Sequence, residues 1–315
     1  MSMTEKAASF RRSVSGFINR LINGSPEHKT GPVPAGNTAT GVLKLIALIF
    51  MFIDHSGKVL FSNNADMRLL GRLAFPLYIW CMIVGFHRTR NPAGYMLRIL
   101  LVGLISQPLY VLALDFEGHI GLLLQNIFKP LSGTFSWDGL WNVMNRIFLT
   151  RPNIFLTLAL GLAAIWGIRE KKLLSQFWAP AAAVVLATVL NADYGWVGVV
   201  AFIVIYGASG TRSGIAAVMV SYFLFWGYYL APTGHIGPKT AFSLYERVVR
   251  LEAYHSTPLK AFLHASETFG LLSLPLILIR FPRDLRMPRW VGYSLYPGHL
   301  VLLILLKIMM FGWTA

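Results

Sequence analysis

Residues 41–61, GVLKLIALIFMFIDHSGKVLF, decide the fold class of this chain. From Gly41 to Ile53 every residue except Lys44 is apolar or glycine. The stretch matches the ~20 residues that an α-helix needs to cross the hydrocarbon core of a bilayer. It also carries two ionisable residues, Asp54 and His55, where such groups are costly and mark function. The stretch therefore predicts a membrane-spanning helix that carries functional side chains.

The composition of the whole chain fits this interpretation. Of 315 residues, 55% are hydrophobic and 13% are charged, and the mean hydropathy is +0.57. These values exclude an ordinary water-soluble domain. The formal charge of +15 does not indicate nucleic-acid binding, because the basic residues lie in short stretches between apolar segments, as in cytoplasmic loops. Cys81 is the only cysteine, so an intramolecular disulfide is excluded and a thiol nucleophile is not expected.

Eight further apolar segments have nearly the length of a spanning helix. With the first, they are 41–61, 69–86, 95–114, 153–168, 173–190, 194–208, 213–231, 264–281 and 291–312. They are too long and continuous for strands of a barrel. The predicted fold class is all-α: a polytopic integral membrane helix bundle with about nine transmembrane helices.

Lys and Arg alternate between loops in a way that sets the orientation. The N-terminus is predicted to be cytoplasmic, with residues 1–40 as a basic tail and linker and residues 41–315 as the transmembrane domain. The C-terminus and the connections 115–152 and 232–263 are then outside. Each connection contains an amphipathic stretch, Trp137–Leu149 and Thr240–Tyr254.

Polar residues on separate segments fall at a similar predicted depth, in the outer half of the bilayer. They are Asp54, Arg72, Gln107, Asn153, Thr157, Asp193, Tyr194 and Glu267, with His299 nearer the midplane. Their common depth predicts a polar chamber open toward the outside. Structural alternatives remain for some: Arg72 and Asp54 as an interior ion pair, and Gln107, Asn153 and Thr157 as interhelical hydrogen-bond partners. Lys44 and Lys58 are expected to extend to the two interfaces.

His55 is the strongest candidate for chemistry, because imidazole is the side chain whose proton moves near neutral pH. We expect a catalytic or proton-relay role for it. Adjacent residues on a helix point about 100° apart, so Asp54 need not orient His55 and is free to engage Arg72.

Several motifs, in order, resemble the TraX family. The first are Leu43–Leu48 leading to Ile53–Asp54–His55, then Leu70–Gly71–Arg72–Leu73–Ala74–Phe75–Pro76–Leu77 and Ile105–Ser106–Gln107–Pro108. Later ones are Asn153–Ile154–Phe155, Asp193–Tyr194–Gly195–Trp196–Val197–Gly198 and Tyr293–Ser294–Leu295–Tyr296–Pro297–Gly298–His299–Leu300. The resemblance covers about residues 41–305.

The resemblance implies an inner-membrane acetyltransferase of a plasmid conjugation system, which acetylates the N-terminal amine of a pilin subunit with acetyl-CoA. The family is also distantly similar to transmembrane acyltransferases that use a histidine of an early membrane helix. The long tail and outer connections of this chain depart from the shorter family members and leave the acceptor open.

These roles assign chemistry to named residues. His55 is the expected general base, with Asp54 beside it and His299 as a second base or donor. The expected substrate-binding residues are Arg72, Gln107, Asn153 and Tyr194, with Arg72 or Asn153 contacting the oxyanion. The predicted inside loops offer cations for the phosphates of CoA, unless these serve only as topology signals: Arg88, Arg90, Arg283, Arg286 and Arg289. No metal site is predicted.

Three other functions remain open from the sequence. A proton-coupled transporter also suits an intramembrane Asp–His pair, although the two halves show no matched pair of broken helices. O-acetylation of a glycan or lipid would use the same chamber. A purely structural assembly factor would tolerate alanine at both histidines.

Overall fold

The computed structural model describes residues 34–61, 64–114, 136–145, 147, 152–227, 266–286 and 288–311. Every regular element in these ranges is helical, which confirms the all-α prediction. The helices are α2 (Thr40–Val59), α3 (Ala65–Gly71), α4 (Ala74–Arg88), α5 (Pro92–Leu114), α7 (Trp137–Asn145), α8 (Ile154–Glu170), α9 (Leu173–Val189), α10 (Gly195–Ala208), α11 (Arg212–Phe225), the 3₁₀ helix η3 (Ser266–Ser273), α14 (Leu274–Leu278) and α15 (Arg289–Phe311).

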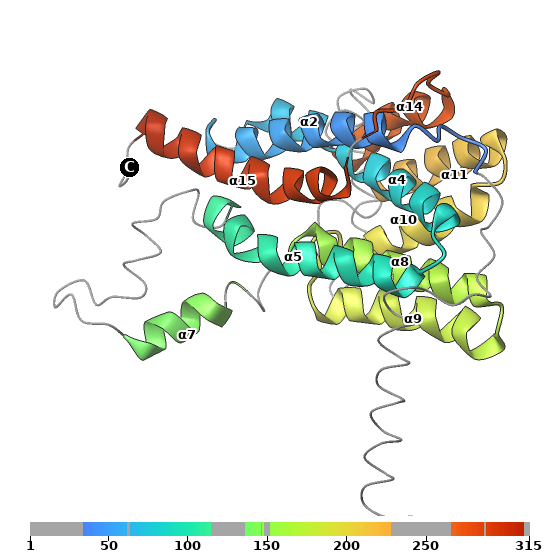
Figure 1. Cartoon of the computed structure of the whole chain (residues 1–315), viewed down its shortest axis with the longest axis horizontal. Coiled ribbons are helices and arrows are strands. Elements are labelled where there is room, and N and C mark those ends of the chain that lie inside the picture. The colour runs from blue at the N-terminus through green and yellow to red at the C-terminus, as the bar shows by residue number, and fades with distance from the viewer. Residues whose placement is uncertain are drawn as a thin grey trace, which may run out of the picture.

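Helix α4 lies at the centre of the bundle. It packs against α2, α8, α10 and η3, and its side chains Leu77, Ile79, Trp80 and Ile83 are fully buried. Helices α2 and α15 run side by side, α5 packs against both α15 and α8, and α8, α9 and α10 form a group of their own (Figure 1). The first and last helices are thereby neighbours, which brings together residues from the two ends of the chain.

Helix α9 exposes large apolar side chains, as a helix that faces lipid does. Leu173, Phe177, Trp178 and Val189 are each between 64% and 76% exposed. A helix that is apolar on its exposed face as well as its packed face belongs to a membrane span or a large core. In the described ranges, three helices are long and apolar enough to cross a bilayer, Asp66–Arg88, Pro92–Leu114 and Trp290–Phe311. Length and composition therefore indicate a membrane protein.

Each of the nine predicted segments overlaps a helix or consecutive helices of the described residues, and the parts 228–231, 264–265 and 312 lie outside them. The eighth segment, predicted as one span, is a 3₁₀ helix followed by α14, where Pro275 occupies the first turn. Proline favours the start of a helix because it has no N–H to place in the preceding turn. Nine membrane crossings and a cytoplasmic N-terminus stay predictions, because the helices alone do not define a bilayer.

Residues 34–39, which the sequence assigned to the linker, belong to the folded body. The backbone N–H of Asn37 donates to the carbonyl of Ile277 at 2.6 Å, and Trp80 Nε1 donates to the carbonyl of Asn37 at 2.6 Å. Backbone groups of this segment thus form hydrogen bonds with helices that are distant in sequence. Local sequence patterns do not predict such contacts. The earlier part of the tail lies outside the described residues.

The two predicted outer connections are described only in part. Helix α7 confirms a helix within the amphipathic stretch Trp137–Leu149, and its Trp137 and Trp141 are exposed. The second stretch, Thr240–Tyr254, lies outside the described residues.

Candidate active site

Two histidines from opposite ends of the chain meet between α2 and α15. His55 Nδ1 lies 2.9 Å from His299 Nε2, and the two rings stack with centroids 5.1 Å apart and planes 24° from parallel. A hydrogen bond between two imidazole nitrogens requires one donor and one acceptor, so at least one ring in this pair is neutral. His299 is 6% exposed, whereas His55 is only partly buried. His55 is therefore the more accessible member of the pair.

Helical periodicity places both histidines one turn beyond residues that line a cavity. On α2, Lys44, Leu48 and Met51 line a cavity, and His55 is the next residue on that face of the helix. On α15, Gly292, Tyr293 and Tyr296 line the same cavity, and His299 follows one turn later. The rings of Tyr296 and His299 are 5.0 Å apart, so the histidine pair adjoins this end of the cavity.

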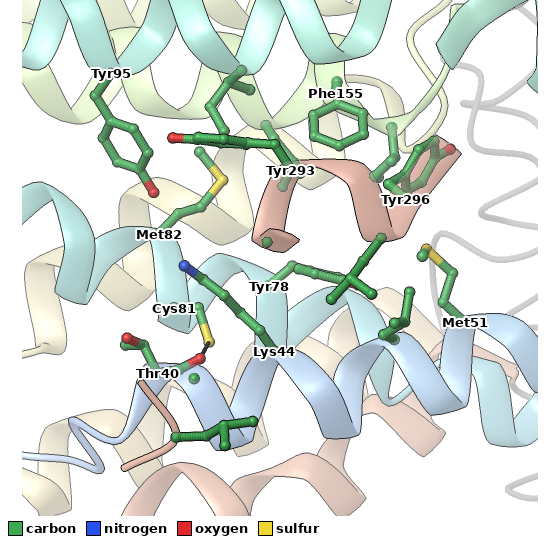
Figure 2. A pocket seen from close by; sticks show the side chains of 18 of the residues that line it. Thr40, Lys44, Met51, Tyr78, Cys81, Met82, Tyr95, Phe155, Tyr293 and Tyr296 are labelled. Carbon is green, nitrogen blue, oxygen red and sulfur yellow. Dashed lines mark hydrogen bonds between the residues drawn. The ribbon is translucent and has the colours of Figure 1, made fainter. Parts of the chain in front are cut away.

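The cavity has a volume of about 390 Å³. Figure 2 shows that Thr40 and Cys81 lie toward one end of it, while Met51, Tyr296 and Phe155 lie at the other. Its walls are largely apolar, but Tyr78, Tyr95 and Tyr293 are also among the lining residues. A long cavity with apolar walls and a few polar groups is typical of a site for an extended organic ligand.

The segment that connects α14 to α15 lines the cavity beside the start of α2. Asp284 Oδ1 accepts hydrogen bonds from the backbone N–H groups of Gly41 at 2.8 Å and Val42 at 3.3 Å. It thereby serves the unpaired donors of the first helical turn of α2. A Cβ atom at Gly41 would lie 1.9 Å from the carbonyl oxygen of Leu285, so glycine allows the segment to approach α2. Asp284, Leu285 and Arg286 all line the cavity as a result.

The expected donor-binding arginines have different surroundings in the structure. Arg286 lines the cavity, and Arg283, on the same segment, is exposed. Arg88 ends α4 and donates from Nη2 to the carbonyl of Thr38 at 3.2 Å, close to the start of α2. Arg90 is exposed just beyond α4. Arg289 begins α15, and its side chain lies outside the described part of the chain.

Arg72 forms a second polar cluster with Tyr194 and Glu267. Its Nη1 atom lies 3.3 Å from Glu267 Oε1 and donates to the hydroxyl of Tyr194 at 3.4 Å. Tyr194 in turn stacks on Phe75, with ring centroids 3.9 Å apart. The sequence placed these residues at one depth, and the structure brings all three into contact.

The ion pair that the sequence left open between Arg72 and Asp54 is replaced by the pair with Glu267. Asp54 faces α3 instead: its Oδ1 is 4.0 Å from Arg68 Nε, and its Cβ is the nearest atom to a side chain built at Gly71. The absence of a Cβ at Gly71 lets α3 pack directly over Asp54. As the 100° rotation between neighbours predicts, the group that contacts His55 is His299 and Asp54 points elsewhere.

Gln107 and Asn153 join α5 to the start of α8. Gln107 Oε1 accepts from the backbone N–H of Asn153 at 2.8 Å, and its Nε2 donates to the carbonyl of Ile147 at 2.6 Å. Asn153 Nδ2 donates to the carbonyl of Gly103 at 2.8 Å, while its Oδ1 caps α8 through Phe155 N–H at 3.1 Å. These contacts match the alternative of interhelical hydrogen bonding.

We expect Asn153→Ala to destabilise the protein without a comparable change in turnover per folded molecule. The substitution removes a helix cap and a buried interhelical hydrogen bond to the Gly103 carbonyl, which together cost about 1–3 kcal/mol. Thermal unfolding in detergent and the rate per folded molecule measure the two effects. Normal stability with lost turnover would instead assign Asn153 to the substrate.

Two cavity residues escaped the sequence-based assignment of roles. Lys44 was assigned to the interface, although its spacing from His55 already places both on one face of a helix. Tyr296 belonged to a family motif without a role, yet its hydroxyl is buried and has no partner among the described residues. The missing information was which face of each helix lines the cavity.

Comparisons with known proteins show which sequences this chain is similar to. The model of the TraX protein family matches residues 39–132 and 142–307. A probable fimbrial assembly protein FimC, serogroup H1, of Dichelobacter nodosus is 32% identical over 135 residues, which are 42% of this chain and 46% of that protein. The uncharacterized protein RP591 of Rickettsia prowazekii (strain Madrid E) is 36% identical over 66 residues, 21% of this chain and 25% of that protein.

The match thus spans less than half the length of either relative, and no solved structure matches the chain significantly. The family model, in contrast, covers most of the chain, including both histidines, Arg72 and the residues that line the cavity. The chain belongs to the TraX family.

Proposed function

We propose that this protein is an inner-membrane acetyltransferase that moves an acetyl group from acetyl-CoA to the N-terminal amine of a pilin subunit. The observation that carries the proposal is a cavity lined by Arg286 and also by Tyr296, whose ring contacts that of His299 in the His55–His299 pair. Family membership supports it. So does the similarity to a protein named as a fimbrial assembly protein.

The donor enters the cavity from the end formed by α2 and the segment before α15. The predicted orientation puts this end in the cytoplasm, where acetyl-CoA is found. Arg88, Arg283 and Arg286 lie on the elements that surround it, and guanidinium groups bind phosphate well. The acetyl thioester then lies at the far end, next to the histidines.

The transfer requires a base and a donor for the oxyanion. The neutral amine nitrogen attacks the thioester carbonyl carbon while His55 accepts a proton from the nitrogen. The tetrahedral oxyanion is stabilised by hydrogen-bond donors, and the unpaired hydroxyl of Tyr296 is one available donor. The C–S bond then breaks, the sulfur of CoA takes the proton from the imidazolium, and the products are an amide and free CoA.

In this proposal the acceptor approaches from the opposite side of the histidine pair. The polar groups assigned to it are Asp54, which directly precedes His55 on α2, and the Arg72–Tyr194–Glu267 cluster. Carboxylates attract an ammonium group before it loses its proton. An amine acceptor therefore suits these residues.

Intact-mass measurement of the pilin tests the proposal. Pilin from cells with the wild-type protein is expected to carry one acetyl group at its N-terminus, and pilin from cells with His55→Gln is expected to lack it. Hydroxylamine treatment separates the acceptors, because it removes acetyl esters and leaves the amide. Identical pilin masses in both strains would contradict the proposal, and acetyl-CoA consumption by the purified protein without pilin acetylation would favour a glycan or lipid acceptor.

A further inference from the structure

Lys44 places a cation inside the cavity. Its side chain rises from α2 toward Met82, with the nitrogen at its tip (Figure 2). Among the described residues it makes no ion pair and no hydrogen bond, and the nearby carboxylate of Asp284 accepts from Gly41 and Val42 through Oδ1. An ammonium group in such surroundings favours an anionic ligand.

Lys44 and His55 are separated along one face of the same helix. His55 follows Lys44 by eleven positions, which correspond to a rise of about 16 Å and to directions that differ by about 20° around the helix. Leu48 and Met51, on the same face between them, line the cavity. The helix therefore sets a fixed distance between a cation in the cavity and the proposed base.

This distance matches the chemistry of a coenzyme A thioester. About thirteen bonds separate its sulfur from the nearest phosphorus atom, and an extended chain advances about 1.2 Å per bond, so the arm spans about 16 Å. The arm itself is uncharged, with two amides and one hydroxyl. The tyrosine hydroxyls and apolar walls of the cavity suit such a chain.

We propose that Lys44 binds the pyrophosphate of the acyl-CoA donor and thereby sets the depth at which the thioester stops, beside His55. This inference rests on the proposed function and adds the residue that positions the donor. The proposal also assigns Arg286 to the adenosine end of the donor. The segment that carries Arg286 contacts the start of α2 at Gly41, which precedes Lys44 on that helix. The ammonium group of lysine is a compact charge on a flexible stem, so it can bind a phosphate from several directions. This suits a ligand that is itself flexible.

Cys81 provides a direct measure of donor binding. It is the only cysteine of the chain and lines the same cavity, with a side chain that is 1% exposed. N-ethylmaleimide must therefore enter the cavity to reach it, and a donor in the cavity is expected to slow the alkylation below the rate measured first in the donor-free protein. Acetyl-CoA and S-acetylpantetheine, which has the same arm and no phosphate, are compared in wild-type protein, Lys44→Met and Lys44→Arg. Lys172→Gln, at the exposed start of α9, serves as the control.

The expected result is specific to the phosphates. In Lys44→Met, half-protection by acetyl-CoA should require about ten to a hundred times more donor, while protection by acetylpantetheine stays unchanged. Lys44→Arg keeps the charge and should stay close to wild type. Insertion is not at risk, because removal of a charge from an apolar helix favours the membrane.

Two other outcomes would overturn the inference in distinguishable ways. Unchanged protection by acetyl-CoA in Lys44→Met, or an equal loss for both donors, would remove Lys44 as the phosphate ligand and leave the acetyltransferase proposal intact. Failure of both donors to protect wild-type Cys81 would remove the cavity as the donor site and, with it, the proposed function.

Discussion

His55→Gln is expected to insert and fold but to transfer acetyl groups about 10²- to 10⁴-fold more slowly, the loss typical of a missing general base. Glutamine retains polarity and approximate size, and it can still bond to His299 Nε2, which His55 contacts at 2.9 Å. It cannot accept a proton from an attacking amine. The rate of acetyl-CoA consumption by the purified protein, with pilin present, measures the loss.

The matched variant is His299→Gln. In the structure His299 is buried and contacts His55, which is the more accessible ring. His299 is therefore expected to position His55, and its replacement by glutamine should cost less turnover than the change at His55. If His55→Gln keeps most of the turnover while His299→Gln loses it, His299 is the base. If both retain turnover, neither histidine acts in the chemistry.

Breaking the Arg72–Glu267 pair is expected to have the largest effect on stability. The side chains are 19% and 14% exposed, so removal of either partner leaves a largely buried charge. The expected cost is about 3–5 kcal/mol for Arg72→Met or Glu267→Met alone. The double variant Arg72→Met with Glu267→Met should recover most of this stability, because two apolar side chains replace the buried pair. Thermal unfolding in detergent, followed by tryptophan fluorescence, measures these differences.

Arg68→Met is the control, because it breaks a longer and more exposed ion pair. Arg68 lies 4.0 Å from Asp54, with side chains 30% and 18% exposed, and its loss should cost less than about 1 kcal/mol. Equal stability of Arg72→Met and Arg68→Met would contradict a structural role for the Arg72 pair. A double variant that folds but fails to transfer acetyl groups would show that Arg72 also contacts the substrate.

The positions of the helices were predictable from the sequence because they depend on local properties. A run of about twenty apolar residues commits the backbone to a helix in a bilayer, where every N–H and C=O must be paired within the segment. The predicted segment 41–61 and helix Thr40–Val59 differ by two residues at most. The boundary at residue 40 was placed too late, because the backbone of residues 34–39 bonds to Ser209 and Ile277, far along the chain.

For the candidate site, the sequence predicted the residues but not which of them contact one another. His55, His299, Arg72, Tyr194 and Glu267 stood out as polar residues in apolar segments, and the structure brings them into contact as one pair and one cluster. The partners within that set were not predictable. Gln107 and Asn153 are also polar residues in or next to apolar segments, yet they bond to each other and to backbone groups. A buried amide can join two helices as well as bind a ligand, and the sequence does not distinguish the two roles.

The sequence by itself determined the helical membrane character, the limits of most helices, the family resemblance and the shared face of Lys44 and His55. All of these depend on composition or on the 3.6-residue period of a single helix. The tertiary structure alone decided that His55 meets His299 across 244 positions, that Arg72 pairs with Glu267 instead of Asp54, and that Lys44 turns into a cavity. These choices depend on how each helix is rotated against its neighbours. In an apolar solvent that rotation is set by close packing and interhelical hydrogen bonds between distant segments, which hydrophobic periodicity does not encode.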